Sequence, residues 1–245
     1  MSTITALGLA LLGLLLLVGG KQGLANFLAL VINAVVMILA VVLMAGGFNP
    51  IAVAVVAGLF VLAAVIFLST KDASVAGAAF VASLAVMGLV LAVVVTAVIL
   101  SHTAGFGQED SEELEGFSLY IGISFQSLLI ATGLLSTLGA IAEAAVAVAA
   151  GMTELGAAAT LAARRRMAGA IIGTGLNTLF FGFFGGFAGL FVWFAQLHYP
   201  FWEILNNQIF AGELIQVLFA VIAVTLTVPI TMWVVLTRAK GGRPS

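Results

Sequence analysis

The segment Phe117–Ala163 reads FSLYIGISFQSLLIATGLLSTLGAIAEAAVAVAAGMTELGAAATLAA, and it constrains how the rest of the chain can be arranged. It is too apolar to lie in water, yet it is too long for one membrane crossing, which takes about 20 residues. Near its middle stands one acid, Glu143, in the run AIAEAAVAVAAGM. Because a carboxylate in such surroundings is costly, it usually serves a purpose. A functional site is therefore expected here first.

The composition identifies an integral membrane protein. Of the 245 residues, 63% are hydrophobic and 7% are charged, whereas a soluble domain has about 25% charged residues. Several uncharged runs exceed the length of a transmembrane helix, about 18 residues, and they lack the alternating pattern of barrel strands. The predicted fold is therefore all-α and polytopic, with a single transmembrane domain over residues 1–245. The chain has no cysteine, which excludes disulfides, thiol catalysis and thiolate metal sites.

About seven crossings are expected from the apolar runs: Thr3–Val18, Leu24–Gly46, Ile51–Leu68, Val75–Leu100, Phe117–Leu138, Met167–Ala195 and Glu213–Leu236. With this number, all eight Lys and Arg residues fall on one side of the membrane. The positive-inside rule places that side in the cytoplasm, with Arg164, Arg165 and Arg166 as topology anchors and 238–245 as a basic tail. The N-terminus is then outside and the C-terminus inside.

An acidic loop at 101–116 falls on the outer side in this arrangement. It contains Glu109, Asp110, Glu112, Glu113 and Glu115. Acidic residues contribute little to orientation, so the loop adds only weak support to the topology. It is either a solvated connector or a vestibule that attracts cations.

The charges also constrain the segment that follows this loop. Residues 117–163 begin outside and end inside, so they must cross the membrane an odd number of times. A single crossing uses only part of this segment, and the residues left over lie around 138–153. We expect this surplus to be a re-entrant or interfacial helix, or an oblique, broken continuation of one long helix. Non-helical backbone at membrane depth is tolerated only where protein or water covers it. Four glycines supply places to break: Gly133, Gly139, Gly151 and Gly156.

Polar side chains recur at helical spacing in three of these segments. Glu143 shares one helix face with Ser136, Ala147, Ala150 and Glu154. We expect it either to bind a proton or cation, or to be a protonated or hydrogen-bonded structural carboxyl.

The sixth and seventh crossings add further polar groups. Thr174, Asn177 and Thr178 precede a glycine-rich stretch, which favours either close helix packing or an unwound helix with free backbone groups. Glu213 and Gln216 belong to a polar stripe on the last crossing. Asn177 has an alternative interpretation as a hydrogen-bond donor between helices. Glu213 lies at the outer end of the last crossing, and its alternative interpretation is a residue that is simply solvated.

Three blocks of the sequence resemble the YibE/F-like bacterial membrane proteins: GAIAEAAVAVAAGMTEL, IIGTGLNTLFFGFFGG and LNNQIFAGELIQVLFAVIAVTLTVPIT. Their order and spacing match the family pattern over roughly the last half of the chain. The family's first block often has Asp at the position of Glu143, so a carboxylate is retained on a longer arm. The family's TxTNT-like element appears here as Thr174–Thr178, with a departure at its second threonine.

The resemblance implies an architecture and a partner rather than a reaction. The chain is similar to the short, YibF-type members, which lack a larger extracytoplasmic N-terminal region. This implies a protein of the bacterial plasma membrane that contacts the lipid bilayer. It also implies a YibE-type membrane subunit as partner, in a homo- or hetero-oligomer.

Two functions from different classes fit these features. The first is a permease or transport-complex subunit for an ion or small polar solute, in which Glu143 binds a proton or cation. Thr174, Asn177, Thr178, Gln216 and Glu213 are then the other pathway residues. The second is a non-transporting scaffold or assembly subunit, in which the polar groups only satisfy one another. An enzyme is not expected, because the sequence has no metal-ligand motif and no convincing nucleophile–base pair. We expect no cofactor, no metal and no binding of nucleic acid.

Overall fold

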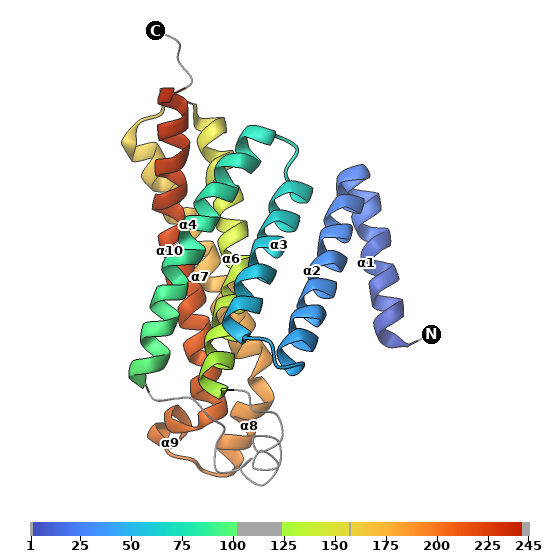
Figure 1. Ribbon diagram of the computed structural model, residues 1–245, viewed down its shortest axis with the longest axis vertical. Coiled ribbons are helices and arrows are strands. Elements are labelled where there is room, and N and C mark those ends of the chain that lie inside the picture. Colours follow the sequence, from blue (N-terminus) through green and yellow to red (C-terminus); the bar gives the residue numbers. More distant parts are fainter. Residues whose placement is uncertain (1, 102–123, 157, 242–245) are drawn as a thin grey trace.

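The computed structural model describes residues 2–101, 124–156 and 158–241, and these residues form helices and no strands (Figure 1). The helices in the described part are α1 (Thr3–Gly19), α2 (Lys21–Ala45), α3 (Pro50–Ser69), α4 (Ala73–Ser101), α6 (Phe125–Leu155), α7 (Leu161–Gly186), α8 (Ala188–Gln196), α9 (Phe201–Asn206) and α10 (Gln208–Gly241). The all-α prediction is therefore confirmed for this part of the chain.

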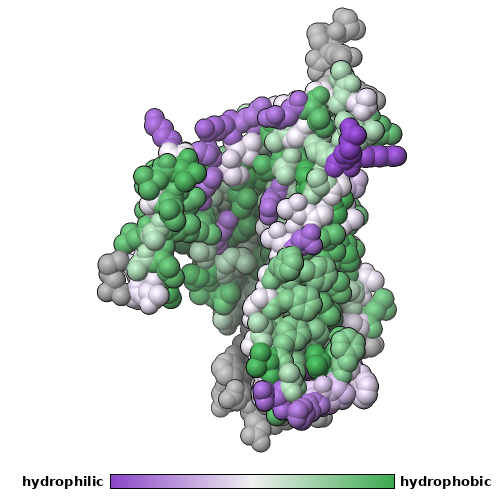
Figure 2. Space-filling model, turned by 180° about the vertical axis from the view of Figure 1, so that it is seen from behind, coloured by the Kyte–Doolittle hydropathy of each residue, from purple (hydrophilic) through white to green (hydrophobic). Residues whose placement is uncertain are grey.

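Six of these helices are long and apolar enough to cross a membrane: α2, α3, α4, α6, α7 and α10. The apolar helix α1 has 17 residues, which gives it a length of about 25 Å, shorter than the hydrocarbon core of about 30 Å. The expected count of seven is thus not confirmed, although a multi-pass membrane protein is. Figure 2 shows hydrophilic residues gathered towards the two ends of the molecule, with a mostly apolar surface between them.

The extra length of the segment 117–163 belongs to one long helix and not to a broken one. Helix α6 runs without interruption from Phe125 to Leu155 over 31 residues, a length of about 46 Å. The prediction of a re-entrant or broken segment at 138–153 is therefore wrong. Alanine is the best helix former, and the alanine-rich run keeps the backbone helical despite Gly139 and Gly151. The residues 117–123 that were expected to begin this crossing lie outside the described residues.

A break does occur in the crossing that was expected to span Met167–Ala195. Helix α7 ends at Gly186 and α8 begins at Ala188, with Phe187 between them at φ −96° and ψ 7°. Each glycine in a helix costs about 1 kcal/mol relative to alanine, so the pair Gly185–Gly186 is a weak place in α7. A cluster of buried phenylalanines, Phe183, Phe194 and Phe210, joins α7, α8 and α10 beside this break.

Helix α6 is the centre of the bundle. It packs against α3, α4, α7 and α10, while α2 packs on α3 and α1 packs on α2. Small residues permit these contacts. A Cβ atom at Gly133 of α6 would lie 3.1 Å from Val94 of α4 and 3.3 Å from Phe219 of α10. The bare backbone at Gly133 therefore allows three helices to meet closely.

The helix ends that carry the described basic residues lie at one end of the bundle (Figure 1). Lys21 begins α2, Lys71 lies between α3 and α4, Arg164–Arg166 lie in the first turns of α7, and Arg238 lies in the last turn of α10. This agrees with the placement of the cations on one side of the membrane. The acidic loop predicted at 101–116 lies outside the described residues after Ser101. Of the tail predicted at 238–245, the first four residues continue α10.

Replacing Gly133 with leucine is expected to destabilise the bundle, because the new side chain would enter the space held by Val94 and Phe219. Overpacking of this kind costs about 1–3 kcal/mol. The matched control is Gly139→Leu on the same helix, where no atom lies within 4 Å of the added Cβ. Thermal unfolding in detergent measures the effect. Equal melting temperatures for the two variants would contradict this account of the packing.

Candidate functional site

Glu143 lies well inside the length of α6. It is about 27 Å along the axis from Phe125 and about 18 Å from Leu155. Its side chain is exposed on the single chain, as are those of Ser136, Ala147 and Glu154, whereas Ala150 is half-buried. The prediction that these residues share one face is confirmed. The opposite face of α6 is fully buried, at Ala142, Ala145 and Val148 among others.

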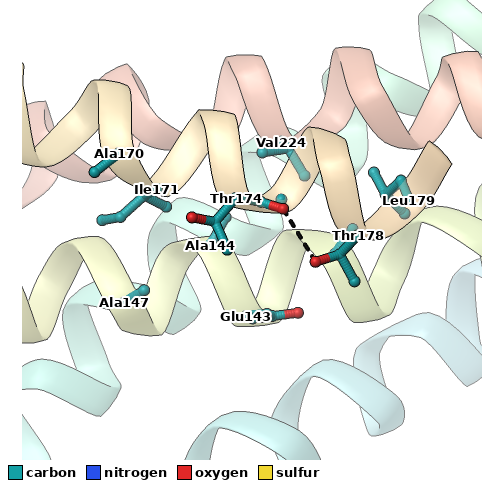
Figure 3. A pocket seen from close by; sticks show the side chains of 11 residues that line it. Glu143, Ala144, Ala147, Ala170, Ile171, Thr174, Thr178, Leu179 and Val224 are labelled. Atoms are coloured by element: carbon teal, nitrogen blue, oxygen red, sulfur yellow. Dashed lines mark hydrogen bonds between the residues drawn. The ribbon is translucent and has the colours of Figure 1, made fainter. Parts of the chain in front are cut away.

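Glu143 opens into a pocket between α6 and α7. The pocket has a volume of about 340 Å³, and Thr174 and Thr178 of α7 line it together with Glu143. Figure 3 shows Glu143 on one helix and the two threonines on the other, with Val224 of α10 behind them. Small residues leave this space open: Ala140, Ala144, Ala147, Ala170 and Gly175.

One of the two threonine hydroxyls in the pocket is arranged as an acceptor. The Thr178 hydroxyl donates a hydrogen bond of 3.0 Å to the backbone carbonyl of Thr174, so only its lone pairs face outward. Within the described residues, the Glu143 carboxylate has neither a hydrogen bond nor an ion pair. A carboxylate and hydroxyl oxygens are ligands suited to a proton or a hard cation, and they suit an anion poorly.

The structure brings only part of the predicted pathway together. Asn177 is exposed on α7 and does not line the pocket with its neighbours Thr174 and Thr178. Gln216 and Glu213 are half-buried on α10 and also lie outside the pocket. Gln216 precedes Val224 by eight residues, which is about 12 Å along the helix. The roles of Asn177, Gln216 and Glu213 stay predictions.

The sequence reasoning missed the contribution of α10 to this pocket. Gly175 of α7 lies against Val224, whose Cγ1 would be 3.3 Å from an added Cβ. This close approach places α10 behind α6 and α7, and so closes one side of the pocket. The sequence shows that Gly175 is a small residue on the predicted helix. It does not show that this residue packs against a valine of a helix that is distant in the chain.

No metal centre is evident in the described part of the chain. Groups of three or more His, Asp or Glu side chains close enough to hold a metal ion do not occur among those residues. A cation in the pocket would therefore depend on Glu143 as its one charged ligand, which is typical of weak and transient binding rather than of a structural metal site.

A family model described as YibE/F-like protein matches residues 7–241. The match extends over nearly the whole chain, and so includes the amino-terminal half as well as the three blocks that carry the resemblance. No curated protein and no solved structure matches this chain.

Proposed function

The chain belongs to the YibE/F-like family, and on that premise we propose that it is a permease or transport-complex subunit for an ion or small polar solute. The observation that carries the proposal is that Glu143 lies in the middle part of a membrane-spanning helix and lines a pocket. A carboxylate that opens into a pocket within a membrane-spanning helix must meet water, a cation or a polar partner, because contact with lipid alone is costly.

In this proposal the Glu143 carboxylate takes up a proton or cation, which removes its charge while the solute moves. Thr174 and Thr178 supply oxygen acceptors across the pocket from it. Asn177 on α7, and Gln216 and Glu213 on α10, extend the pathway towards the end of the bundle that carries α8 and α9. The assignment is to transport rather than to catalysis.

We further propose a bacterial plasma-membrane location with the basic end in the cytoplasm. The support is the gathering of Lys71, Arg164–Arg166 and Arg238 at one end of the bundle, because basic residues are retained on the cytoplasmic side. The N-terminus is then outside and the C-terminus inside.

A partner subunit of the YibE type completes the proposal. Helix α7 has 26 residues, of which Phe183 is the one buried residue. On the face seen in Figure 2, the molecule is hollowed beside the α1–α2 hairpin. A neighbouring membrane protein in this hollow would cover the small residues and the carboxylate on the open face of α6.

The same uncovered surface supports a second candidate function. A scaffold or assembly subunit would use the open faces of α6 and α7 to hold a partner, with Asn177 and Gln216 as hydrogen-bonding groups between helices. In that case Glu143 is satisfied by the partner and binds no solute.

The transport proposal predicts that Glu143→Gln lowers ion flux by about tenfold or more, because a neutral amide can neither bind a proton reversibly nor compensate a cation's charge. The protein is reconstituted with the co-expressed YibE-type subunit in liposomes. Proton flux is followed with an entrapped pH-sensitive dye, and sodium flux with a sodium indicator. Glu154→Gln is the matched control, since Glu154 lies on the same face of α6 but outside the pocket. Equal flux for the wild type and Glu143→Gln at every pH would remove Glu143 from the coupling role.

The scaffold candidate predicts a different pattern. The double change Asn177→Ala and Gln216→Ala would reduce co-purification of the YibE-type subunit about fivefold or more, because two hydrogen bonds between helices are lost. Thr225→Ala serves as the control, since the Thr225 hydroxyl donates to the carbonyl of Val221 in its own helix, at 2.8 Å. Normal assembly of the double variant would count against the scaffold.

The orientation can be measured by cysteine labelling, because the chain has no cysteine of its own. Single cysteines are placed at two exposed positions on opposite ends, Ala162→Cys and Gln196→Cys. We expect a membrane-impermeant maleimide to label Gln196→Cys in intact cells, and to label Ala162→Cys only after the membrane is opened. The reverse result would invert the proposed topology.

A further inference from the structure

A second pocket lies at the basic end of the bundle, between α4, α6, α7 and α10. Its volume is about 390 Å³, and two arginines distant in sequence line it, Arg164 of α7 and Arg238 of α10. The Arg238 side chain reaches across to α4, where its Nη1 would lie 3.0 Å from a Cβ atom at Gly77. The absence of a side chain at Gly77 lets this guanidinium lie against α4.

The pocket concentrates positive charge. Its lining includes two guanidinium groups and neither Asp nor Glu. Asp72 and Glu154 line a separate pocket, which shares only Val75 and Thr153 with this one. An anion bound in this cavity would be attracted by both guanidinium groups.

The hydroxyl groups of the lining are already engaged. The Ser74 side chain hydrogen bonds to the Asp72 carboxylate, and with the backbone amides of Ser74 and Val75, which also donate to it, it holds the pKa of that carboxyl below its usual value. The Thr153 hydroxyl donates to the carbonyl of Ala149 at 2.9 Å. Recognition of an anion in this pocket would therefore depend on the arginines, which bind phosphate oxygens in a bidentate manner.

The rest of the lining is apolar. Val75, Met152, Val235 and Leu236 form much of the wall, and they belong to membrane-spanning helices near their basic ends. A fully hydrated ion gains nothing from such a wall, whereas a lipid can place its phosphate at the arginines and an acyl chain along the apolar side chains. Basic pockets between helices are a known mode of binding for anionic lipid headgroups.

We propose that the pocket between α4, α6, α7 and α10 binds the phosphate headgroup of an anionic membrane lipid through Arg164 and Arg238. The inference does not depend on transport by Glu143, because the two pockets share no lining residue.

The test measures lipid retention by native mass spectrometry. Detergent-solubilised protein is titrated with phosphatidylglycerol, and separately with phosphatidylcholine. The wild type is expected to bind phosphatidylglycerol at least about tenfold more tightly than the zwitterionic lipid, and Arg164→Gln with Arg238→Gln to lose that preference. The matched control is Arg165→Gln with Arg166→Gln, which removes the same charge from exposed positions outside the pocket. The control is expected to keep the preference.

Two outcomes overturn the proposal. If both double variants lose phosphatidylglycerol equally, the attraction belongs to the basic surface as a whole and not to the pocket. If millimolar inorganic phosphate displaces the lipid completely, the arginines take a free phosphate and the apolar wall contributes nothing.

A second pair of variants covers the case in which loss of Arg164 and Arg238 impairs folding. Ala239 lines the pocket and is exposed, so Ala239→Glu adds a carboxylate at the site without crowding the core. It is expected to weaken phosphatidylglycerol binding about tenfold. Ala162→Glu, on exposed surface outside the lining, is expected to have little effect. Equal binding by these two variants would also contradict the proposal.

Discussion

Close contact between α6 and its neighbours is the interaction on which the bundle depends. Inside a bilayer the surrounding lipid is as apolar as the side chains, so helices associate through packing rather than through hydrophobic burial. The buried positions of α6 include Gly133, Ala142 and Ala145, and the side chains there are small or absent. The backbones can therefore approach closely, and many weak dispersion contacts add up.

Other small residues have the opposite effect on the face of α6 that is turned towards α7. Between α6 and α7, Ala140, Ala144 and Ala147 are too short to fill the space, and a pocket remains beside Glu143. Packing on one face and a cavity on the other thus come from one alanine-rich sequence. A larger residue at Ala144 or Ala147 would fill the pocket, so the composition of the run matters for the opening as much as for the core.

Hydrophobicity and periodicity predicted the helices and the shared face of Glu143, because both depend on local sequence. The broken segment was wrongly predicted because a length rule of about 20 residues treats any longer apolar run as more than one element. A bilayer does not forbid a longer helix, which can tilt or extend beyond the hydrocarbon. Hydrogen bonding within α6 satisfies its backbone at membrane depth, whereas a break would expose unpaired groups. Contacts between distant helices, such as Gly175 with Val224, depend on the tertiary arrangement, and no local pattern reports them.

The two pockets are separate sites, although α6, α7 and α10 line both of them. Met152, in the basic pocket, follows Glu143 by nine residues on α6, which is about 13 Å along the axis and half a turn around it. On α10, Val224 and Val235 belong to different pockets, and Pro229 lies between them inside the helix. Proline has no amide hydrogen, so the carbonyl of Thr225 lacks its usual helical donor and α10 bends more easily there than elsewhere. A rotation of the basic end of α10 about Pro229 would therefore move Arg238 while leaving Val224 packed against Gly175.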